Sequence, residues 1–383
     1  MFENLGHSAG RYGAELALLE LLEGLVSQGV DCKVLVPEKG PLLAELDRLH
    51  IEWRLVEFPP WRPRRRRFRK RVFRTIVALR FAFPMARAIR EWKCDIVYTN
   101  TVVVVAGAFA AFLARRPHVW HLHEFCYVDP NERFDLGKEF VTWLIEHLSA
   151  VIVANSHVLK QEYAKYIHPR KFRVIYQAVT LRESGCNLLP PGVQITAFKC
   201  IVVGSLQGLK AQDEAILAIA EARRQGVPAT LLLVGGGDLA FRTTLEELAE
   251  QCGITPYVIF HGYAENPQSL IDAVDVVLIC SRFESFGRVT VEAMLGGKAV
   301  IGTASGGTAE LIQNGKTGLL YTPGDHNELD AWIRYLYENA EEKCRLGAAA
   351  RAWAADRFNQ KKYAGEVAHL LDETLAREKN RLR

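Results

Sequence analysis

Short apolar runs rich in β-branched residues alternate with longer stretches of helical spacing along the whole chain. In the first half, we expect strands at 33–36, 53–57, 96–98, 119–122 and 151–153, and helices near 13–27, 42–49, 72–91 and 134–147. In the second half, we expect strands at 200–204, 230–234, 257–260, 274–279 and 299–301, and helices near 326–339 and 341–379. Because parallel strands are joined by helical crossovers, this alternation predicts βαβ units in an α/β protein with parallel sheets.

The length of the chain and a glycine- and proline-containing segment near its middle predict two domains. At 383 residues there is room for two domains of ordinary size. A segment with two glycines and two prolines over 183–197 is typical of a linker between a domain at 1–182 and another at 198–355, followed by a terminal helix at 356–383. Pro84 predicts a kink in the helix at 72–91. Only the segment 1–6 stands before the Gly-rich turn at 10–13 where a first strand is expected, so we expect either a short first strand or a start further upstream.

Composition narrows the class of protein. Hydrophobic residues make up 49% and charged residues 24%, which is typical of a globular protein. The longest apolar run, 101–114, is too short to cross a bilayer, and the first residues lack the cationic and apolar segments of a signal peptide. Eight scattered cysteines without a Cys-x-x-Cys pair predict reduced, mostly buried thiols and a cytoplasmic location.

Charge is distributed unevenly along the chain. Residues 1–200 carry 29 basic and 20 acidic side chains, whereas residues 201–383 carry 19 and 24. Nine of the thirteen residues at 62–74 are cationic, and apolar residues lie among them. This segment predicts contact with an anionic membrane surface, with a solvated loop as the alternative. Nucleic acid is disfavoured because no recognition motif accompanies the charge. The predicted membrane contacts are Arg64, Arg65, Arg66, Arg67, Arg69, Lys70 and Arg71.

Two glutamates stand near the start of a predicted helix in the second half. Glu284 follows the apolar run at 274–279, and Glu292 lies eight positions further on, after the turn at Gly287. Ligands of open α/β sheets bind at the carboxyl ends of strands, and helix N-termini accept phosphates or hydroxyls. Two carboxylates there can accept hydrogen bonds from a ribose or a hexose. The alternatives are two solvated acids or a hydrolytic acid–base pair, although hydrolases do not usually place such a pair at a helix start.

These motifs resemble a known family. The run Ser-x-x-Glu-x-Phe-Gly around Glu284, then Gly306-Gly307-x-x-Glu310 and Gly318-Leu-Leu, is similar to family 4 of the retaining, nucleotide-sugar-dependent glycosyltransferases. The resemblance covers nearly the whole chain. It implies the GT-B architecture, in which two Rossmann-like domains face a central cleft that holds the donor and the last helix crosses back to the first domain. It also implies metal-independent transfer of a sugar, with retention, from a nucleotide sugar to a saccharide or lipid-linked acceptor, in cell-surface polysaccharide or glycolipid assembly.

The resemblance also implies roles for individual residues. His123, in the sequence His121-Leu-His123-Glu124, would contact the reacting sugar, and Glu284 would hold the sugar hydroxyls; these two form the predicted catalytic set. Lys210 would bind the diphosphate and Glu292 the ribose. Relatives carry an arginine where this chain has Ser205, so Arg282, Arg288 or helix N-termini would have to supply the missing charge. The predicted donor-binding residues are Gly13, Ser205, Lys210, Tyr263, Glu284, Ser285, Phe286, Gly287, Arg288 and Glu292.

Several alternatives stay open. His118, His121, His123 and Glu124 could form a metal site, although consecutive strand positions rarely converge on a metal, and His123 could have a purely structural role. Gly235-Gly-Gly237 imitates a dinucleotide fingerprint. A nucleotide-sugar epimerase with the same fold is the enzymatic alternative, and an inert sugar-nucleotide-binding protein is the alternative from another class. No cofactor and no metal is expected.

Overall fold

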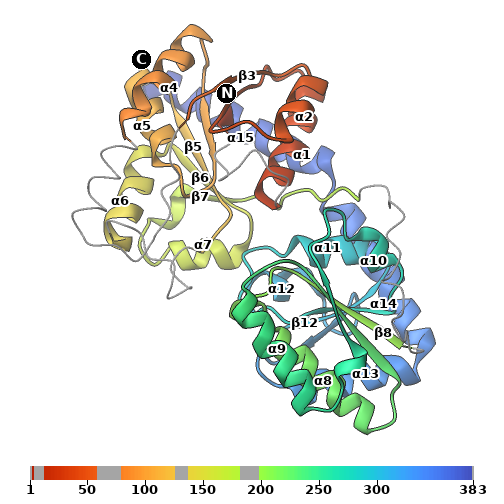
Figure 1. Cartoon of the computed structure of the whole chain (residues 1–383). Coiled ribbons are helices and arrows are strands. Elements are labelled where there is room, and N and C mark those ends of the chain that lie inside the picture. Colours follow the sequence, from red (N-terminus) through yellow and green to blue (C-terminus); the bar gives the residue numbers. More distant parts are fainter. Residues whose placement is uncertain (1, 4–12, 58–78, 126–136, 182–197, 382–383) are drawn as a thin grey trace. The chain divides into compact units, whose positions relative to one another are not determined.

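The computed structural model describes residues 2–3, 13–57, 79–125, 137–181 and 198–381. They fall into two compact units, shown in Figure 1. Unit 1 comprises Met1–Ala178 and Phe358–Arg383, and unit 2 comprises Val179–Arg357. The chain therefore leaves unit 1 once and returns to it with its last helix. The predicted linker at 183–197 lies outside the described residues.

Unit 1 contains a parallel sheet in the order β3-β2-β1-β4-β5-β6-β7. Phe2 pairs with Val34 and Tyr98, so the short first strand lies inside the sheet, between β2 and β4. The strands are β1 (Phe2–Glu3), β2 (Lys33–Val36), β3 (Glu52–Leu55), β4 (Val97–Asn100), β5 (His118–Leu122), β6 (Val151–Ala154) and β7 (Phe172–Val174). All residues of β4, β5 and β6 are buried, as expected for strands covered on both faces.

Helices cover both faces of the unit 1 sheet. One core joins α1, α2 and α15 to alternate residues of β2, β4, β5 and β6, while α4, α5 and α6 lie on the other side in Figure 1. The helices are α1 (Gly13–Ser27), α2 (Leu42–Arg48), α4 (Ala82–Glu91), α5 (Val105–Ala114), α6 (Lys138–Leu148), α7 (His157–Tyr163), the 3-10 turn η1 (Pro169–Lys171) and α15 (Gln360–Arg381).

The helical region is interrupted near the kink expected at Pro84. Residues 79–80 are helical, Phe81 forms a turn, and α4 begins at Ala82 with Pro84 as its third residue. Proline is tolerated in a first turn because the backbone N–H that it lacks has no partner inside the helix there. The apolar run at 101–114 provides the ten-residue α5. Within the described ranges, no helix combines the length and the apolarity needed to cross a membrane.

Unit 2 contains a second parallel sheet, in the order β10-β9-β8-β11-β12-β13. Its strands are β8 (Phe198–Val203), β9 (Ala229–Val234), β10 (Val258–Gly262), β11 (Val276–Ile279), β12 (Ala299–Thr303) and β13 (Leu319–Tyr321). Its helices are η2 (Gly208–Lys210), α8 (Gln212–Arg224), α9 (Leu239–Gln251), η3 (Thr255–Tyr257), α10 (Gln268–Asp272), α11 (Arg288–Leu295), α12 (Gly306–Leu311), α13 (His326–Glu338) and α14 (Ala340–Arg357). The predicted second domain thus has the expected strand–helix order.

The helical region expected at 341–379 is divided into two helices, and the second begins at Gln360, close to the start expected for the terminal helix at 356. Phe358 and Asn359 separate α14 from α15. Phe358 is buried, with its ring edge-on to that of Tyr176, and the side chain of Asn359 accepts a hydrogen bond from the N–H of Lys362. This break allows α14 to pack in unit 2 and α15 to pack against α1 in unit 1.

Each sheet has a point where the order of its strands reverses. In unit 1 the reversal lies between β1 and β4, and in unit 2 between β8 and β11. Ligands of open α/β sheets bind beside such points, at the carboxyl ends of the strands. The segments that follow β8 and β11 are therefore the first places to look for a site in unit 2, and the ends of β4 and β5 are the equivalent places in unit 1.

Candidate active site

The segment after β8 ends in a lysine at the switch point of unit 2. The chain passes from Gly204 through η2 to Lys210, and Ala211 then turns into α8 with a left-handed φ of 48° although it is fully buried. A non-glycine residue in this region of φ/ψ space stores strain, and such residues gather at functional sites. Gln212 ties this segment down, because its side-chain amide donates to the carbonyl of Ser205 over 2.9 Å.

The segment after β11 carries Glu284 and lies against the segment after β8. The N–H of Arg282 donates to the carbonyl of Leu209 over 2.9 Å. The ammonium group of Lys210 forms an ion pair with Glu284, and their side chains are 26% and 19% exposed. The structure thus brings together the two residues that were predicted to bind the diphosphate and the sugar, although 74 positions separate them in the sequence.

The Gly306-Gly307 pair, at the start of α12, packs against the backbone of the segment that holds Glu284. The N–H of Gly307 donates to the carbonyl of Glu284 over 2.7 Å. A Cβ atom at Gly307 would lie 2.7 Å from the carbonyl oxygen of Ser285 and 2.8 Å from Cα of Phe286, which is closer than real Cβ contacts come. The motif Gly-Gly-x-x-Glu is therefore needed for the close approach of α12 to the segment that holds Glu284.

Helix α11 begins directly after this segment. Gly287 forms its N-cap with a φ of 94°, a left-handed conformation that favours glycine. Phe286 is buried, and Ser285 is partly exposed. Arg288 and Glu292 lie one turn apart, with 3.7 Å between Nε of the arginine and Oε1 of the glutamate, and their side chains are 10% and 19% exposed. The start of α11 thus places a cation and a carboxylate beside backbone N–H groups that point out of the helix end.

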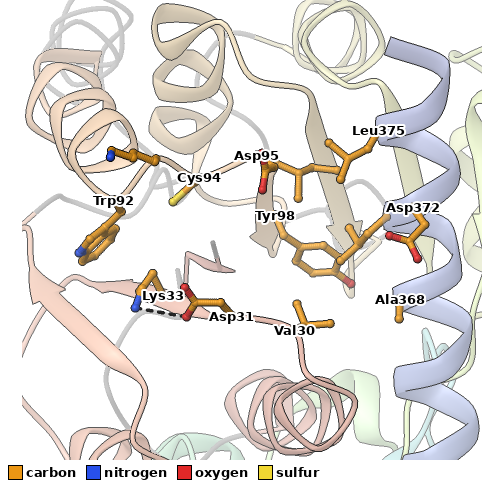
Figure 2. Close-up of a pocket in the computed structure, with 13 residues that line it drawn as sticks. Val30, Asp31, Lys33, Trp92, Cys94, Asp95, Tyr98, Ala368, Asp372 and Leu375 are labelled. Carbon is orange, nitrogen blue, oxygen red and sulfur yellow. Dashed lines mark ion pairs between the residues drawn. The ribbon is translucent and has the colours of Figure 1, made fainter. Parts of the chain in front are cut away.

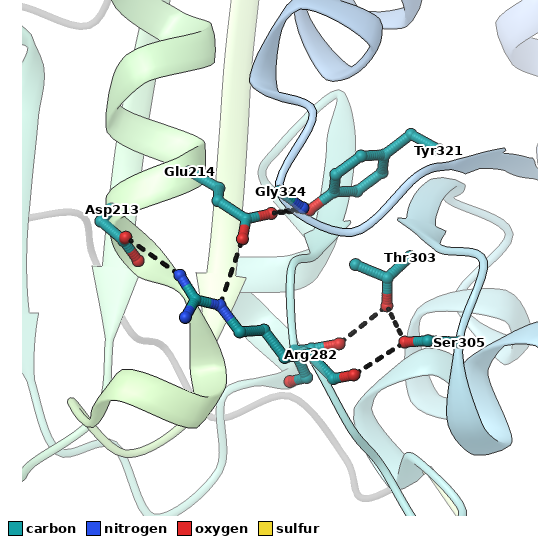
Figure 3. Close-up of polar contacts among 8 residues, drawn as sticks. Asp213, Glu214, Arg282, Thr303, Ser305, Tyr321 and Gly324 are labelled. Atoms are coloured by element: carbon teal, nitrogen blue, oxygen red, sulfur yellow. Dashed lines mark hydrogen bonds and ion pairs between the residues drawn. The ribbon is translucent and has the colours of Figure 1, made fainter.

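A second polar cluster, shown in Figure 3, joins the segment after β11 to the start of α8 through Arg282. Arg282 approaches Asp213 at 3.5 Å and Glu214 at 3.4 Å. Glu214 is buried and also accepts hydrogen bonds from the hydroxyl of Tyr321 and the N–H of Gly324, both over 3.1 Å. Burial raises the pKa of Tyr321 far above its usual value, so its hydroxyl stays protonated and able to donate.

Asp213, Glu214 and Tyr321 were not predicted from the sequence. The only signal was a pair of acids at the start of a helix, which is common. Arg282 was one of the residues expected to offset the arginine that Ser205 replaces. In the structure its guanidinium lies against these two carboxylates, so part of its charge is already compensated.

The Gly-rich stretch after β9 contacts the segment after β8. The N–H of Leu206 donates to the carbonyl of Gly236 over 2.8 Å, and a Cβ at Gly237 would lie 2.5 Å from the carbonyl oxygen of Leu206. These glycines therefore serve the packing of one loop on another. Ser205 itself is exposed, and Tyr263, which follows β10, is 63% exposed. Both remain accessible at the edge of the sheet where Lys210 lies.

In unit 1, His123 lies just beyond β5 and is held by Asn100, the last residue of β4. Nε2 of His123 is 2.8 Å from Oδ1 of Asn100, and the amide nitrogen of Asn100 donates to the carbonyl of Ala14 over 3.1 Å. His121 and His123 share a face of the strand, as expected, with their rings 4.0 Å apart. The hydroxyl of Thr101 donates to Oε1 of Glu124 over 2.8 Å. Asn100 is a further residue that the sequence did not single out.

The other two histidines of this strand are buried and neutral. His118 faces away from His121, and its ring nitrogens lie 2.8 Å from the hydroxyl of Thr99 and 3.2 Å from the carbonyl of Leu148. Burial lowers the pKa of His118 to about 3 and that of His121 well below its usual value. No group of three or more His, Cys, Asp or Glu residues suited to a metal occurs in the described part of the chain.

Unit 1 also has a cavity of about 200 Å³, shown in Figure 2. It lies beside the amino ends of β2 and β4 and is closed by Ala368, Leu371 and Leu375 of α15. Asp31 and Lys33 form an ion pair of 3.2 Å in its wall. Because this is the edge of the sheet opposite to His123, the cavity is separate from the candidate site.

Two sets of predicted residues cannot be placed fully. The predicted membrane contacts at 64–71 lie outside the described residues. Gly13 is described, and it is the exposed first residue of α1, but the rest of its Gly-rich turn is not.

The six described cysteines are free thiols, and four of them are buried. Burial raises the pKa of Cys32 and of Cys280 to about 12.

Comparison with known proteins identifies the family. The model of "Glycosyl transferases group 1" matches residues 193–353, and the model of "Glycosyltransferase Family 4" matches residues 12–183. The chain is 30% identical over 313 residues to N-acetyl-alpha-D-glucosaminyl L-malate synthase of Bacillus anthracis, covering 79% of this chain and 81% of that protein. It is 29% identical over 316 residues to 2-deoxystreptamine glucosyltransferase of Streptomyces kanamyceticus, covering 76% and 80%.

Solved structures show the same fold. HepE of Anabaena in complex with UDP superposes with a TM-score of 0.78 over 97% of this chain and 99% of that one, at 24% identity. Sucrose-phosphate synthase of Thermosynechococcus elongatus superposes with a TM-score of 0.75 over 98% of each chain, at 19% identity. The chain thus has the GT-B fold, and it belongs to the group 1 and family 4 glycosyltransferases, enzymes that transfer sugars from nucleotide sugars.

Proposed function

We propose that this glycosyltransferase transfers a hexose or related sugar from a nucleoside diphosphate sugar with retention of the anomeric configuration and without a metal. The observation that carries the proposal is the Lys210–Glu284 pair at the switch point of unit 2. A departing diphosphate needs positive charge, and the sugar needs hydrogen-bond acceptors. Lys210 and Arg288 supply the first and Glu284 the second. Retention is inferred from membership of family 4.

Further groups in each unit extend the assignment. Glu292, in the second turn of α11, would accept hydrogen bonds from the ribose. The N–H groups of Phe286 and Gly287, with the exposed side chain of Ser205 and the partly exposed side chain of Ser285, would bind phosphate or sugar oxygens. Tyr263 would lie beside the base. His123 in unit 1 would contact the donor sugar, and Gly13 would allow the start of α1 to approach the phosphates.

Calorimetric titration tests the donor class. UDP, GDP, ADP and NAD are titrated into the wild type, into Glu292→Ala, and into Glu246→Ala, a matched control on the exposed face of α9. We expect micromolar binding of one nucleoside diphosphate, weakened in Glu292→Ala and unchanged in the control. Binding of NAD alone, or of no diphosphate by a folded protein, would contradict the proposal.

Product analysis tests the reaction. With the sugar nucleotide that binds, NMR of the product is expected to show the same anomeric configuration as the donor, and a chelator is expected to leave the rate unchanged. Formation of an epimeric sugar nucleotide in the absence of any acceptor would instead favour the epimerase, whereas tight binding without turnover would favour an inert binding protein.

We also propose a saccharide or lipid-linked acceptor, in polysaccharide or glycolipid assembly at a membrane surface. The observation behind this is the outer face of α4, α5 and α6. It exposes the aromatic side chains Phe83, Phe112, Phe140 and Trp143, which are 67%, 67%, 44% and 50% accessible. The same helices and their ends expose Arg87, Arg90, Arg115, Arg116 and Lys138. Aromatic rings among cations are typical of surfaces that contact anionic lipid.

Vesicle sedimentation tests the membrane surface. The protein is expected to pellet with vesicles that contain an anionic phospholipid and to stay in the supernatant with a zwitterionic one. Trp143→Ser with Phe140→Ser is expected to reduce binding, whereas Tyr335→Ser, a comparably exposed aromatic of unit 2, is expected to leave it unchanged. Equal pelleting with both kinds of vesicle, or equal loss in both variants, would contradict this part of the proposal.

A further inference from the structure

Arg282 is the residue at which the segments after β8, β11 and β12 meet in unit 2. Its backbone N–H donates to the carbonyl of Leu209 over 2.9 Å, one position before Lys210. Its carbonyl accepts a hydrogen bond from the hydroxyl of Ser305 over 2.9 Å, and Glu284 follows two positions further along the chain. The backbone of Arg282 therefore lies between the segments that carry Lys210 and Glu284, and a shift of this residue changes how the two are placed.

The side chain of Arg282 extends to a buried carboxylate, as Figure 3 shows. Nε of Arg282 is 3.4 Å from Oε1 of Glu214, and the two side chains are 53% and 5% exposed. The other carboxylate oxygen of Glu214 accepts hydrogen bonds from the hydroxyl of Tyr321 and the N–H of Gly324, both over 3.1 Å. Glu214 is thus held by β13 and the turn after it, and its remaining oxygen faces Arg282.

Burial of Glu214 makes its contact with Arg282 more than a surface ion pair. The interior solvates a charge poorly, so a buried carboxylate that loses its cation is left with an uncompensated charge. Asp213 also approaches the guanidinium, at 3.5 Å, but its side chain is 37% exposed. Because the guanidinium itself is half exposed, solvent screens the pair with Glu214, and we expect a moderate effect when that pair is broken.

We propose that Glu214 is a positioning residue for the donor sugar, which acts through Arg282 to hold the carboxylate of Glu284 where it accepts hydrogen bonds from sugar hydroxyls. This inference rests on the proposed function for the role of Glu284, and every contact that carries it lies within unit 2. Glu214 itself would not contact the substrate. The diphosphate depends instead on Lys210, whose segment the side chain of Gln212 ties down independently.

One substitution removes the contact with Arg282 and keeps the other contacts of Glu214. In Glu214→Gln the amide oxygen can still accept from Tyr321 and Gly324, and because the N–H of Gly324 can only donate, the oxygen stays on that side. The NH₂ group then faces the guanidinium, so two donors meet. Asp330→Asn is the matched control, because Asp330 is also buried in unit 2 and lies 3.2 Å from Nε of Arg334.

Calorimetry with a sugar nucleotide and with its nucleoside diphosphate measures what the sugar contributes. UDP-glucose and UDP-N-acetylglucosamine are compared with UDP, GDP-mannose with GDP, and ADP-glucose with ADP. In Glu214→Gln the Kd of the sugar nucleotide is expected to rise about 3- to 5-fold, the effect of losing a half-exposed ion pair, while the Kd of the diphosphate is unchanged. Asp330→Asn is expected to change neither. A merely structural role would weaken both ligands together, and that result overturns the proposal.

Arg282→Met tests whether Glu214 acts through Arg282. This variant is expected to raise the ratio of the two Kd values by the same factor, and the double variant is expected to raise it no further, since both changes remove one contact. Additive effects overturn the proposal. Weaker diphosphate binding in Arg282→Met alone also overturns it, because Arg282 would then bind the diphosphate directly. If Glu214→Gln does not fold, Arg282→Met decides, since an unchanged ratio in that variant contradicts positioning.

Hydrogen exchange separates failure of this role from failure of the proposed function. The N–H groups of Arg282 and Gly307 donate to Leu209 and Glu284, and they are expected to exchange faster in Glu214→Gln than in the wild type or in Asp330→Asn. Unchanged exchange overturns the positioning role even if a diphosphate binds. If the wild type binds no nucleoside diphosphate, the proposed function fails and the role toward a sugar with it, and faster exchange then assigns Glu214 a structural role only.

Discussion

The carboxyl edges of the two sheets follow the same strand–helix order but differ in the kinds of residues that line them. In unit 2, glycines let loops lie directly on one another, and partly exposed ion pairs such as Lys210–Glu284 occupy the space between them. In unit 1, buried histidines lie beside hydroxyl and amide groups, His121 beside Tyr98 and His123 beside Asn100. Charged side chains thus line the proposed diphosphate site of unit 2, and hydrogen-bonded histidines line the proposed sugar contact of unit 1. A shared fold sets where a site lies, and the local packing sets its chemistry.

Filling the close contact between Gly307 and the Glu284 segment is expected to have the largest effect. Gly307→Ala places a Cβ within 2.8 Å of the backbone of Ser285 and Phe286, so α12 or the Glu284 segment must move. Overpacking against backbone that cannot repack is expected to cost unit 2 about 3 kcal/mol and to abolish diphosphate binding. Chemical denaturation measures the loss. Gly208→Ala, where a Cβ meets nothing within 4 Å, is the control, and equal stability of the two variants would contradict this account of the site.

The two members of the Lys210–Glu284 pair are expected to act oppositely on diphosphate binding. Lys210→Met removes the cation and is expected to weaken binding about 10- to 100-fold, or about 1.4–2.8 kcal/mol. Glu284→Gln releases the lysine from its partner, so diphosphate binding is expected to hold or tighten while sugar transfer falls. Calorimetry with the diphosphate and an assay with the sugar nucleotide separate the two. A similar loss of affinity in both variants would mean that the pair is only structural.

Acid is expected to weaken unit 1 through its buried histidines. Below the ordinary pKa of 6.5 the unfolded chain binds a proton at His118, whereas the folded chain keeps it neutral until about pH 3. The unfolded state therefore binds more protons across this window, and stability falls as pH falls, by about 1.4 kcal/mol per pH unit for this group. Thermal melts from pH 7 to 5 of the wild type and of His118→Gln, which cannot titrate, measure it. Parallel curves for the two proteins would refute the assignment.

The smallest effect is expected at the Arg282 cluster. Arg282→Lys keeps the charge near Asp213 and Glu214 but loses the guanidinium geometry, and the arginine is half exposed. Stability is expected to change by under about 1 kcal/mol, with a small rise in the KM for the sugar nucleotide as the Glu284 segment loosens. Steady-state kinetics detect this. A large fall in kcat with unchanged KM would assign Arg282 a direct role in the reaction.

Much of the fold was predictable from the sequence because its signal is local. Apolar runs predicted most of the strands, although not β7 or β13, and the order of strands and helices predicted two parallel sheets. Boundaries were less well predicted. The helical region expected at 72–91 is interrupted at Phe81, three residues before Pro84, and the last helix begins at Gln360 instead of 356. The packing of Phe358 beside Tyr176 joins residues far apart along the chain, which a local pattern does not contain.

The sequence by itself determined the family and the types of residue at the site, because motifs such as Ser-x-x-Glu-x-Phe-Gly and Gly-Gly-x-x-Glu each combine chemistry with a backbone requirement. Only the tertiary structure decided the partners. It pairs Lys210 with Glu284, sets two carboxylates against Arg282 and gives His123 the amide of Asn100. Parallel strands bring residues from distant segments to one edge of a sheet, so the neighbours that set charge and protonation there become apparent only once the strand order is known.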